Sequence, residues 1–109
     1  MAIVINIRYS GQNDNAKQFA HEMTASGVVD RIRAEDGNLR YEYYMPMEDD
    51  STVLLIDSWR DQTALDVHHS SPMMQEIIRL REKYDLHMSV ERYVSDDGIP
   101  SADEQFIRR

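Results

Sequence analysis

The chain has 109 residues, enough for one domain with a single modest hydrophobic core. Lys and Arg number 12 against 20 Asp and Glu, so the net charge of −8 repels nucleic-acid phosphates and we expect no binding of nucleic acid. The absence of cysteine excludes disulfides, thiolate nucleophiles and cysteine-ligated metal centres, and fits a reducing compartment.

The apolar segments of the chain are short. The longest, residues 3–5 and 53–56, fall far short of the ~20 residues that a membrane-spanning helix needs. The first residues lack the charged region and apolar stretch of a secretion signal. We therefore expect a cytoplasmic protein that does not contact a membrane.

The first half of the chain predicts a strand and then a helix. Residues 2–9 alternate between two faces and are rich in β-branched side chains, with Asn6 on the face opposite Ile5. After a polar turn, the apolar spacing of residues 16–23 predicts an amphipathic helix. Gly27 is a suitable residue to end that helix.

The middle of the chain predicts a hairpin. Residues 39–45 alternate and end at Pro46, and residues 52–60 form a second alternating segment with Asp57 and Trp59 on one face. The polar turn between the two segments is short, so the two strands should pair with each other.

The next part predicts two helices and a last strand. Residues 61–67 favour a short helix, and Ser71 followed by Pro72 marks the start of another. Apolar residues at helical spacing continue over residues 73–84, and residues 86–94 alternate as a strand.

The order β-α-β-β-α-β is the split βαβ pattern of a ferredoxin-like α+β fold, an antiparallel sheet with its helices on one face. We expect residues 1–95 to form this domain and residues 96–109 to form an acidic C-terminal tail. Residues 53–56 and the first strand are apolar on both faces, and one chain has nothing left to cover the second face. The pattern therefore predicts a homodimer packed sheet to sheet.

Histidines and aromatic residues are the candidates for chemistry. His68 and His69 lie between the end of a short helix and the start of the next helix. One of them either caps the end of the first helix or faces a functional site. The sequence leaves open which of the two faces inward. The aromatic residues Tyr43 and Trp59 serve either as core or as the wall of a pocket for a planar ligand. No spacing of His, Asp and Glu matches a metal site, so we expect no bound metal.

Three short sequence motifs follow one another along the chain. They are G-N-L-R-Y-E-Y at residues 37–43, L-I-D-S-W at residues 55–59, and A-L-D-V-H at residues 64–68, the last followed by Ser71 and Pro72. Together they resemble the antibiotic biosynthesis monooxygenase (ABM) superfamily, and the resemblance covers residues 2–95. It implies a dimeric α/β barrel in which two ferredoxin-like sheets face each other, with a pocket in each subunit between sheet and helices.

The resemblance also implies an activity. We expect a monooxygenase without any cofactor, which oxidises a quinol-like or phenolic small aromatic with O2. His68 is the expected general base, and Asn6 is expected to hydrogen-bond the developing oxyanion. The expected substrate-binding residues are Trp59, Asp57, Tyr43 and Met73.

Several positions depart from the family pattern. Met73 stands where the family has a second histidine, and Asp57 where it has a glutamate. Asn6 resembles an asparagine of the haem-degrading branch, but residues 77–78 are isoleucines where that branch has its haem-binding histidine. Residues 37–40 resemble a branch that isomerises a phosphorylated dione. An isomerase of a small dione and a non-catalytic small-molecule-binding stress protein therefore stay as alternatives.

Overall fold

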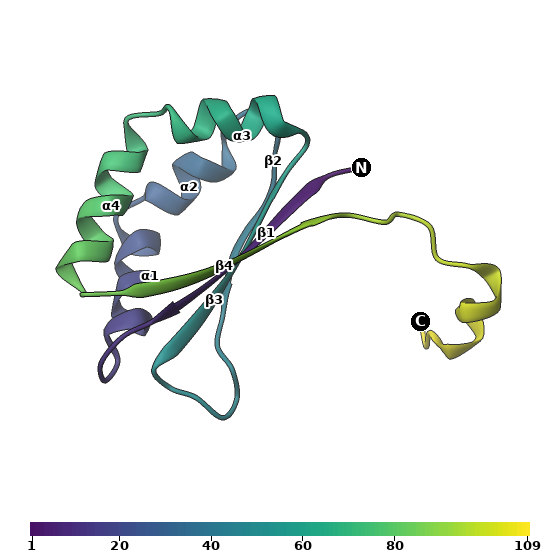
Figure 1. The fold of residues 1–109 in the computed structure, drawn as a ribbon, viewed down its shortest axis with the longest axis horizontal. Coiled ribbons are helices and arrows are strands. Elements are labelled where there is room, and N and C mark those ends of the chain that lie inside the picture. The colour runs from purple at the N-terminus through teal and green to yellow at the C-terminus, as the bar shows by residue number, and fades with distance from the viewer.

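A fully antiparallel sheet of four strands, in the order β2-β3-β1-β4, forms the body of the molecule (Figure 1). The computed structural model describes the whole chain, residues 1–109. The strands are β1 (Ile3–Ser10), β2 (Asn38–Tyr44), β3 (Thr52–Trp59) and β4 (His87–Val94). The central positions of β1 and β3 agree with their high content of β-branched and aliphatic residues.

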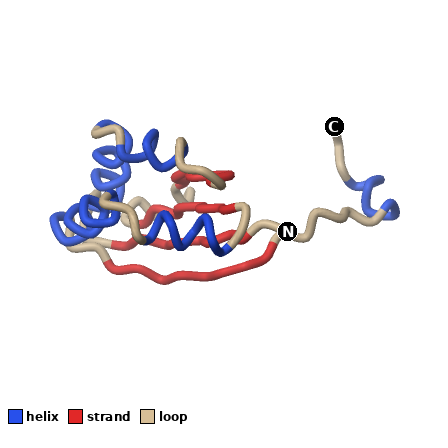
Figure 2. Tube along the Cα trace, turned by 90° about the horizontal axis from the view of Figure 1, so that it is seen from above, coloured by secondary structure: helices blue, strands red, loops and turns tan.

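Four helices lie on one side of this sheet (Figures 1 and 2). They are α1 (Asn15–Ala25), α2 (Val28–Arg33), α3 (Gln62–His69) and α4 (Met73–Lys83). The left-handed conformation of Gly27, with φ of 88°, ends α1 and allows α2 to start at once in a new direction. None of these helices combines the length and the apolar character needed to cross a bilayer. The strand order and the helices on one face of the sheet confirm the ferredoxin-like α+β fold, with α2 as an added helix.

The hydrophobic core fills the space between the sheet and the helices. Alternate residues of β1, from Ile3 to Tyr9, point into it and are buried, as the predicted alternation requires. From the helices, Phe19, Ile32 and Leu80 pack against them.

The opposite face of the sheet is covered by no element of the chain (Figure 1). The aliphatic residues Val4, Leu54 and Ile56 lie at its centre and are half-buried. We call this surface the open face. The sheet is not closed into a barrel within one chain, so the predicted α/β barrel would require a second chain.

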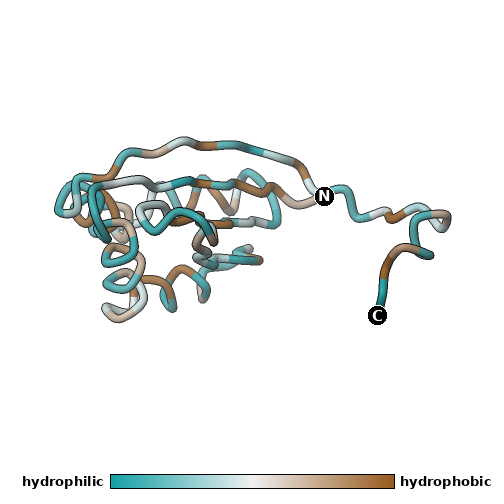
Figure 3. Tube along the Cα trace, turned by 90° about the horizontal axis from the view of Figure 1, so that it is seen from below, coloured by the Kyte–Doolittle hydropathy of each residue, from teal (hydrophilic) through white to brown (hydrophobic).

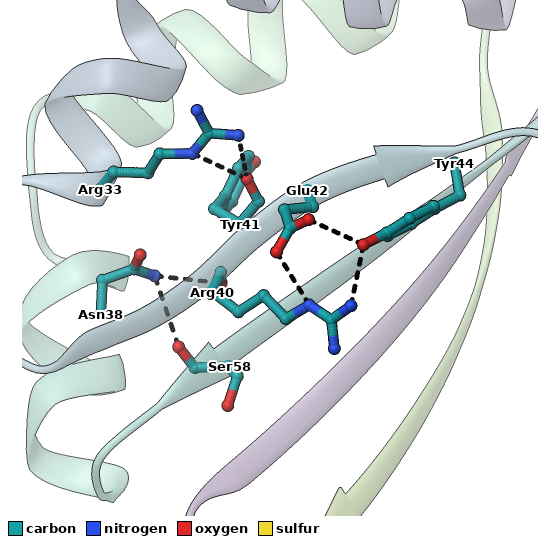
Figure 4. A network of polar contacts seen from close by, with 7 residues as sticks. All are labelled: Arg33, Asn38, Arg40, Tyr41, Glu42, Tyr44 and Ser58. Atoms are coloured by element: carbon teal, nitrogen blue, oxygen red, sulfur yellow. Dashed lines mark hydrogen bonds and ion pairs between the residues drawn. The ribbon is translucent and has the colours of Figure 1, made fainter. Parts of the chain in front are cut away.

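Polar side chains border the open face along β2. Arg40 donates to Glu42 at 3.0 Å and to the Tyr44 hydroxyl at 2.8 Å, and all three side chains lie on the same side of the strand (Figure 4). On the other side, Arg33 donates twice to the Tyr41 carbonyl oxygen, at 2.8 and 3.0 Å (Figure 4). Arg33 therefore covers part of the hydrogen-bonding edge of the sheet, a common protection of edge strands.

The last strand and the residues after it form the margin of the molecule. β4 is an edge strand, and all eight of its residues are exposed. Beyond it the chain runs away from the body and forms a short 3₁₀ helix, Ser101–Phe106, that stands apart from the sheet (Figures 1 and 3). Most of this segment is hydrophilic, with a few apolar residues in it (Figure 3).

Candidate functional site

His68 lies in the last turn of α3 and points toward the sheet, and only 3 % of it is exposed. Its ring stacks on Trp59, with the centroids 4.7 Å apart and the planes at 27°. Its Nδ1 lies 2.8 Å from Oε1 of Glu35. A carboxylate accepts hydrogen bonds only, so the neutral imidazole tautomer that fits this contact has its hydrogen on Nδ1 and its lone pair on Nε2. His69, by contrast, is exposed, so His68 is the histidine that faces inward.

Asp57 lies two residues before Trp59, buried on the helix-facing side of β3. The Trp59 indole donates to one of its oxygens at 2.7 Å, so the two residues hold each other in place. Burial raises the pKa of Asp57 to about 7, with Glu35 adding to the rise, while Trp59 and Arg81 oppose it. A carboxyl group with this pKa exchanges a proton near neutral pH, which an exposed aspartate does not do.

The loop that carries Glu35 approaches α3 because of Gly37. Gly37 has φ of 84°, a conformation that side chains rarely allow, and a Cβ there would lie 2.5 Å from the Ala64 Cβ. The Gly37 carbonyl accepts a hydrogen bond from the Arg60 backbone at 2.8 Å. This close contact brings Glu35 within reach of His68.

Tyrosine side chains and one arginine extend the buried polar group toward β1 and β2. Tyr41 and Tyr43 meet edge to face, with centroids 5.8 Å apart, and burial raises the pKa of both. Arg81 of α4 donates to the Tyr9 hydroxyl through Nη2 at 3.0 Å and through Nε at 3.2 Å. Burial raises the pKa of Tyr9, and the Arg81 charge partly opposes this rise. These hydroxyls remain neutral donors at physiological pH.

The structure brings some of the predicted site residues together and separates one. Asp57 and Trp59 lie beside His68, while Tyr43 and Met73 are half-buried and pack against the same core. Asn6 does not join them.

Asn6 pairs across the sheet with Ile56, whereas its neighbour Ile5 pairs with Asp57. Its side chain therefore lies on the open face, opposite His68, and its Oδ1 is buried without a hydrogen-bond partner. Within one protomer Asn6 and His68 therefore lie on opposite faces of the sheet, because alternate residues of a strand point to opposite faces, and the expected role of Asn6 at the oxyanion stays a prediction.

A hollow of 290 Å³ opens between α1 and the ends of β2 and β3. Its lining is largely apolar and consists of Lys17, Ala20, His21, Thr24, Tyr43, Tyr44, Met45 and Val53. Tyr43 is therefore the residue shared by this hollow and the buried polar group. Neither His68 nor Trp59 reaches it, so the predicted pocket wall around Trp59 is packed rather than open.

No three side chains of the types His, Asp and Glu come together closely enough to hold a metal ion. Glu35 and His68 are joined by a hydrogen bond, and Asp57 accepts one from Trp59.

Sequence reasoning missed Glu35, Tyr9, Tyr41 and Arg81. Tyr41 and Tyr9 occupied alternating strand positions and were indistinguishable from core residues. Glu35 and Arg81 lie far along the chain from their partners, and only Gly37 gave a local sign of a tight turn.

Residues 2–80 match the profile of the family described as antibiotic biosynthesis monooxygenase. The Bacillus subtilis protein YcnE is 24% identical over 76 residues, which span 70% of this chain and 78% of YcnE.

Solved structures share the fold. One from Deinococcus radiodurans superposes with a TM-score of 0.76 at 16% identity, covering 89% of this chain and 95% of the other. SnoaB from Streptomyces nogalater, a cofactor-independent oxygenase, gives a TM-score of 0.74 at 11% identity, with 92% and 98% covered. At these identities, the superpositions show a common fold only.

Proposed function

This chain belongs to the antibiotic biosynthesis monooxygenase family, and we propose that it is a cofactor-independent monooxygenase of a quinol-like or phenolic small aromatic. The main support is the buried His68, whose Nδ1 is engaged by Glu35 while no protein group bonds to Nε2. A neutral imidazole with one nitrogen fixed by a carboxylate and the other free is the usual arrangement of a general base.

The reaction needs no redox partner beyond the substrate. A phenolic C–H position becomes a quinone carbonyl, one oxygen atom of O2 enters the product, and the other leaves as water. The substrate supplies all four electrons that reduce O2. Triplet O2 reacts slowly with neutral phenols, but a phenolate gives up an electron readily, so removal of the phenolic proton is the step that the protein must assist.

His68 takes the phenolic proton at Nε2, and Glu35 stabilises the resulting imidazolium by accepting the Nδ1–H hydrogen bond. Asp57, with its pKa of about 7, exchanges a proton with the reduced oxygen on its way to water. Trp59 gives an apolar surface for the aromatic ring. Since the interior is packed, we expect the half-buried Met73 and Tyr43 to move aside when the substrate binds.

The proposed assembly is a homodimer through the open face. Val4, Leu54 and Ile56 form an apolar centre, and charged residues such as Arg40 and Glu42 surround it, as at typical protein interfaces. Because Arg33 occupies part of the β2 edge, packing of the two faces is favoured over strand addition at that edge. The absence of cysteine fits action in the cytoplasm, which stays a prediction.

The first test is oxygen uptake with a panel of naphthohydroquinones, after subtraction of spontaneous oxidation. His68→Ala should lower turnover by about 10²–10⁴-fold, the usual worth of a general base. His69→Ala is the matched control, because this neighbouring histidine is exposed and should leave turnover unchanged. Glu35→Gln, which keeps the shape of the side chain, should lower turnover less than His68→Ala does.

Equal oxygen uptake by wild type and His68→Ala, with both proteins folded by circular dichroism, would contradict the role of His68. Proton exchange at the α-carbon of a ketone without oxygen uptake would favour an isomerase. Ligand-induced thermal stabilisation with neither activity would favour a non-catalytic binding protein.

A further inference from the structure

We propose that the C-terminal arm, residues 96–109, leaves its own protomer and docks on β4 of a second copy of the chain. The docking surface is the β4 strip, which we define as Met88, Val90, Arg92 and Val94. This inference rests on the homodimer of the proposed function and adds to it an exchange of arms.

The apolar residues of the β4 strip are left uncovered by their own chain. Val90 pairs with Ile7 and Val94 with Ile3, so the strip lies on the helix-facing side of the sheet. The core residues of β1 on that side are buried, yet Val90 is 56% and Val94 is 59% exposed. An apolar row beside a buried core, at the open margin of the sheet, is a surface that needs a cover.

The arm also lacks a partner within its own chain. Phe106 is 81% and Ile99 is 55% exposed, although both are apolar. The arm stands away from the body in two perpendicular views (Figures 1 and 2). The radius of gyration is 15.5 Å. A compact chain of this length would have about 13 Å, so the extended arm enlarges the molecule.

Two hydrogen bonds fix the direction in which the arm leaves the sheet. The Ser95 backbone donates to the Ala2 carbonyl at 2.9 Å, and the Ala2 backbone donates to the Ser95 hydroxyl at 2.8 Å. They hold the chain in line with β4 up to Ser95. To cover its own strip, the arm would have to reverse immediately after these bonds, whereas the extended arm runs away from the body of its own chain (Figure 1).

The charges of the two surfaces are complementary. Arg92, in the middle of the strip, donates to the Gln62 side chain at 2.6 Å and has no carboxylate partner. The arm carries four acidic residues, Asp96, Asp97, Asp103 and Glu104, against two basic residues, Arg108 and Arg109, and Arg109 already pairs with Glu104 at 2.8 Å. A carboxylate from the arm would give Arg92 an ion pair, and opposite charges would favour this docking position over others.

A second copy is the occupant that these features favour. Every copy of the chain carries both the apolar arm and the uncovered strip, so a two-fold dimer makes the same contact twice. Packing of the open faces also brings the partner's body close to the sheet end from which the arm departs.

Docking of the arm would cover the margin of the sheet next to the candidate site. Val94, Ile3 and Trp59 form one cross-strand row on the helix-facing side of the sheet. Arg92, Ile5 and Asp57 form the next row. Asp57 and Trp59 are already buried within one chain, so an arm on the β4 strip would cover the exposed β4 end of these two rows.

The test uses the absence of natural cysteines. A tagged chain with Phe106→Cys and an untagged chain with Val90→Cys are co-expressed, purified as a mixture and mildly oxidised. We expect a disulfide-linked heterodimer on a non-reducing gel. In the matched control, Phe106→Cys is combined with Gln75→Cys, an exposed position on α4, and the cross-linked fraction should be at least tenfold lower.

The outcomes separate this inference from the dimer itself. If the wild type sediments as a monomer, both the homodimer and the arm exchange are wrong. If it sediments as a dimer without a cross-link between Phe106→Cys and Val90→Cys chains, only the arm exchange is wrong. If the two substitutions in one chain give an internal disulfide and no linked dimer, the arm covers its own strip and the inference is overturned.

Discussion

His68 is held by two very different contacts, a stacked indole ring and a carboxylate. The ring contact with Trp59 fixes the plane of the imidazole, and the hydrogen bond to Glu35 selects which nitrogen carries the proton. Asp57 is the third group, and its carboxyl oxygen accepts a hydrogen bond from the indole N–H of Trp59. Together these contacts determine where a proton can be taken up near the sheet.

Asp57→Asn should change how stability depends on pH. In the folded protein the pKa of Asp57 is about 7, above the ordinary value of 3.8, so between these values the folded state holds a proton that the unfolded state releases. This group therefore makes the wild type less stable as the pH rises from about 4 to about 7. The asparagine still accepts from Trp59 and does not titrate, so the variant should lose that part of the decline.

The measurement is urea unfolding at pH 4.5 and pH 8, at one protein concentration. From pH 4.5 to pH 8, the free energy of unfolding of Asp57→Asn should rise by a few kcal/mol relative to that of wild type, at about 1.4 kcal/mol per pKa unit. Asp96→Asn, in the exposed arm, is the control and should follow the wild-type profile. An Asp57→Asn profile parallel to that of wild type would refute a proton on Asp57.

Among the elements, α3 matters most for the site because it carries His68 in its last turn. Its start is fixed by Asp61, whose side chain accepts a hydrogen bond from the Ala64 backbone at 2.9 Å. Ala64 also touches the Gly37 loop, so the same turn of helix sets the positions of both His68 and Glu35. A shift of the start of α3 would therefore displace both His68 and Glu35.

Asp61→Ala should lower the free energy of unfolding by about 1 kcal/mol, the usual cost of losing an N-cap. Asp61→Asn keeps a capping oxygen and removes only the exposed ion pair with Arg60, so it should stay close to wild type. Chemical denaturation of the three proteins measures both effects. Equal losses in the two variants would mean that the cap contributes nothing.

At the scale of the whole molecule, the open face and the uncovered β4 are the surfaces on which the proposed dimer rests. Both surfaces are apolar at positions where a monomer of this size would expose them to water. The extended arm adds a third such surface. The proposed symmetric dimer would cover all three with one arrangement.

Ile56→Lys should convert the dimer to a monomer, because it places a charge at the centre of the packed faces. A buried unpaired charge costs about 2 kcal/mol or more, so the dissociation constant should rise at least about 30-fold. Val67→Lys is the control, since Val67 is an exposed aliphatic residue on α3, away from the open face. Sedimentation equilibrium at micromolar concentration measures both; unchanged dimerisation of Ile56→Lys would place the interface elsewhere.

The sequence by itself determined the order of elements and their faces. Alternation in residues 2–9 and 52–60 fixed which side chains enter the core, because the period of a strand is two and burial selects one face. The helical spacing of apolar residues after Asp14 and Pro72 predicted α1 and α4, because burial selects one face of a helix as well. The sequence also correctly identified the family, through short motifs whose order and spacing along the chain resemble those of the family.

Only the tertiary structure decided which polar groups meet. Glu35 joins His68 across 33 positions, and Arg81 joins Tyr9 across 72, through loop and helix packing that no local pattern encodes. It also separated Asn6 from His68, since a one-residue step along a strand reverses the face. Local periodicity reports whether a residue is inside or outside, whereas the partner of a buried polar group depends on how distant segments pack.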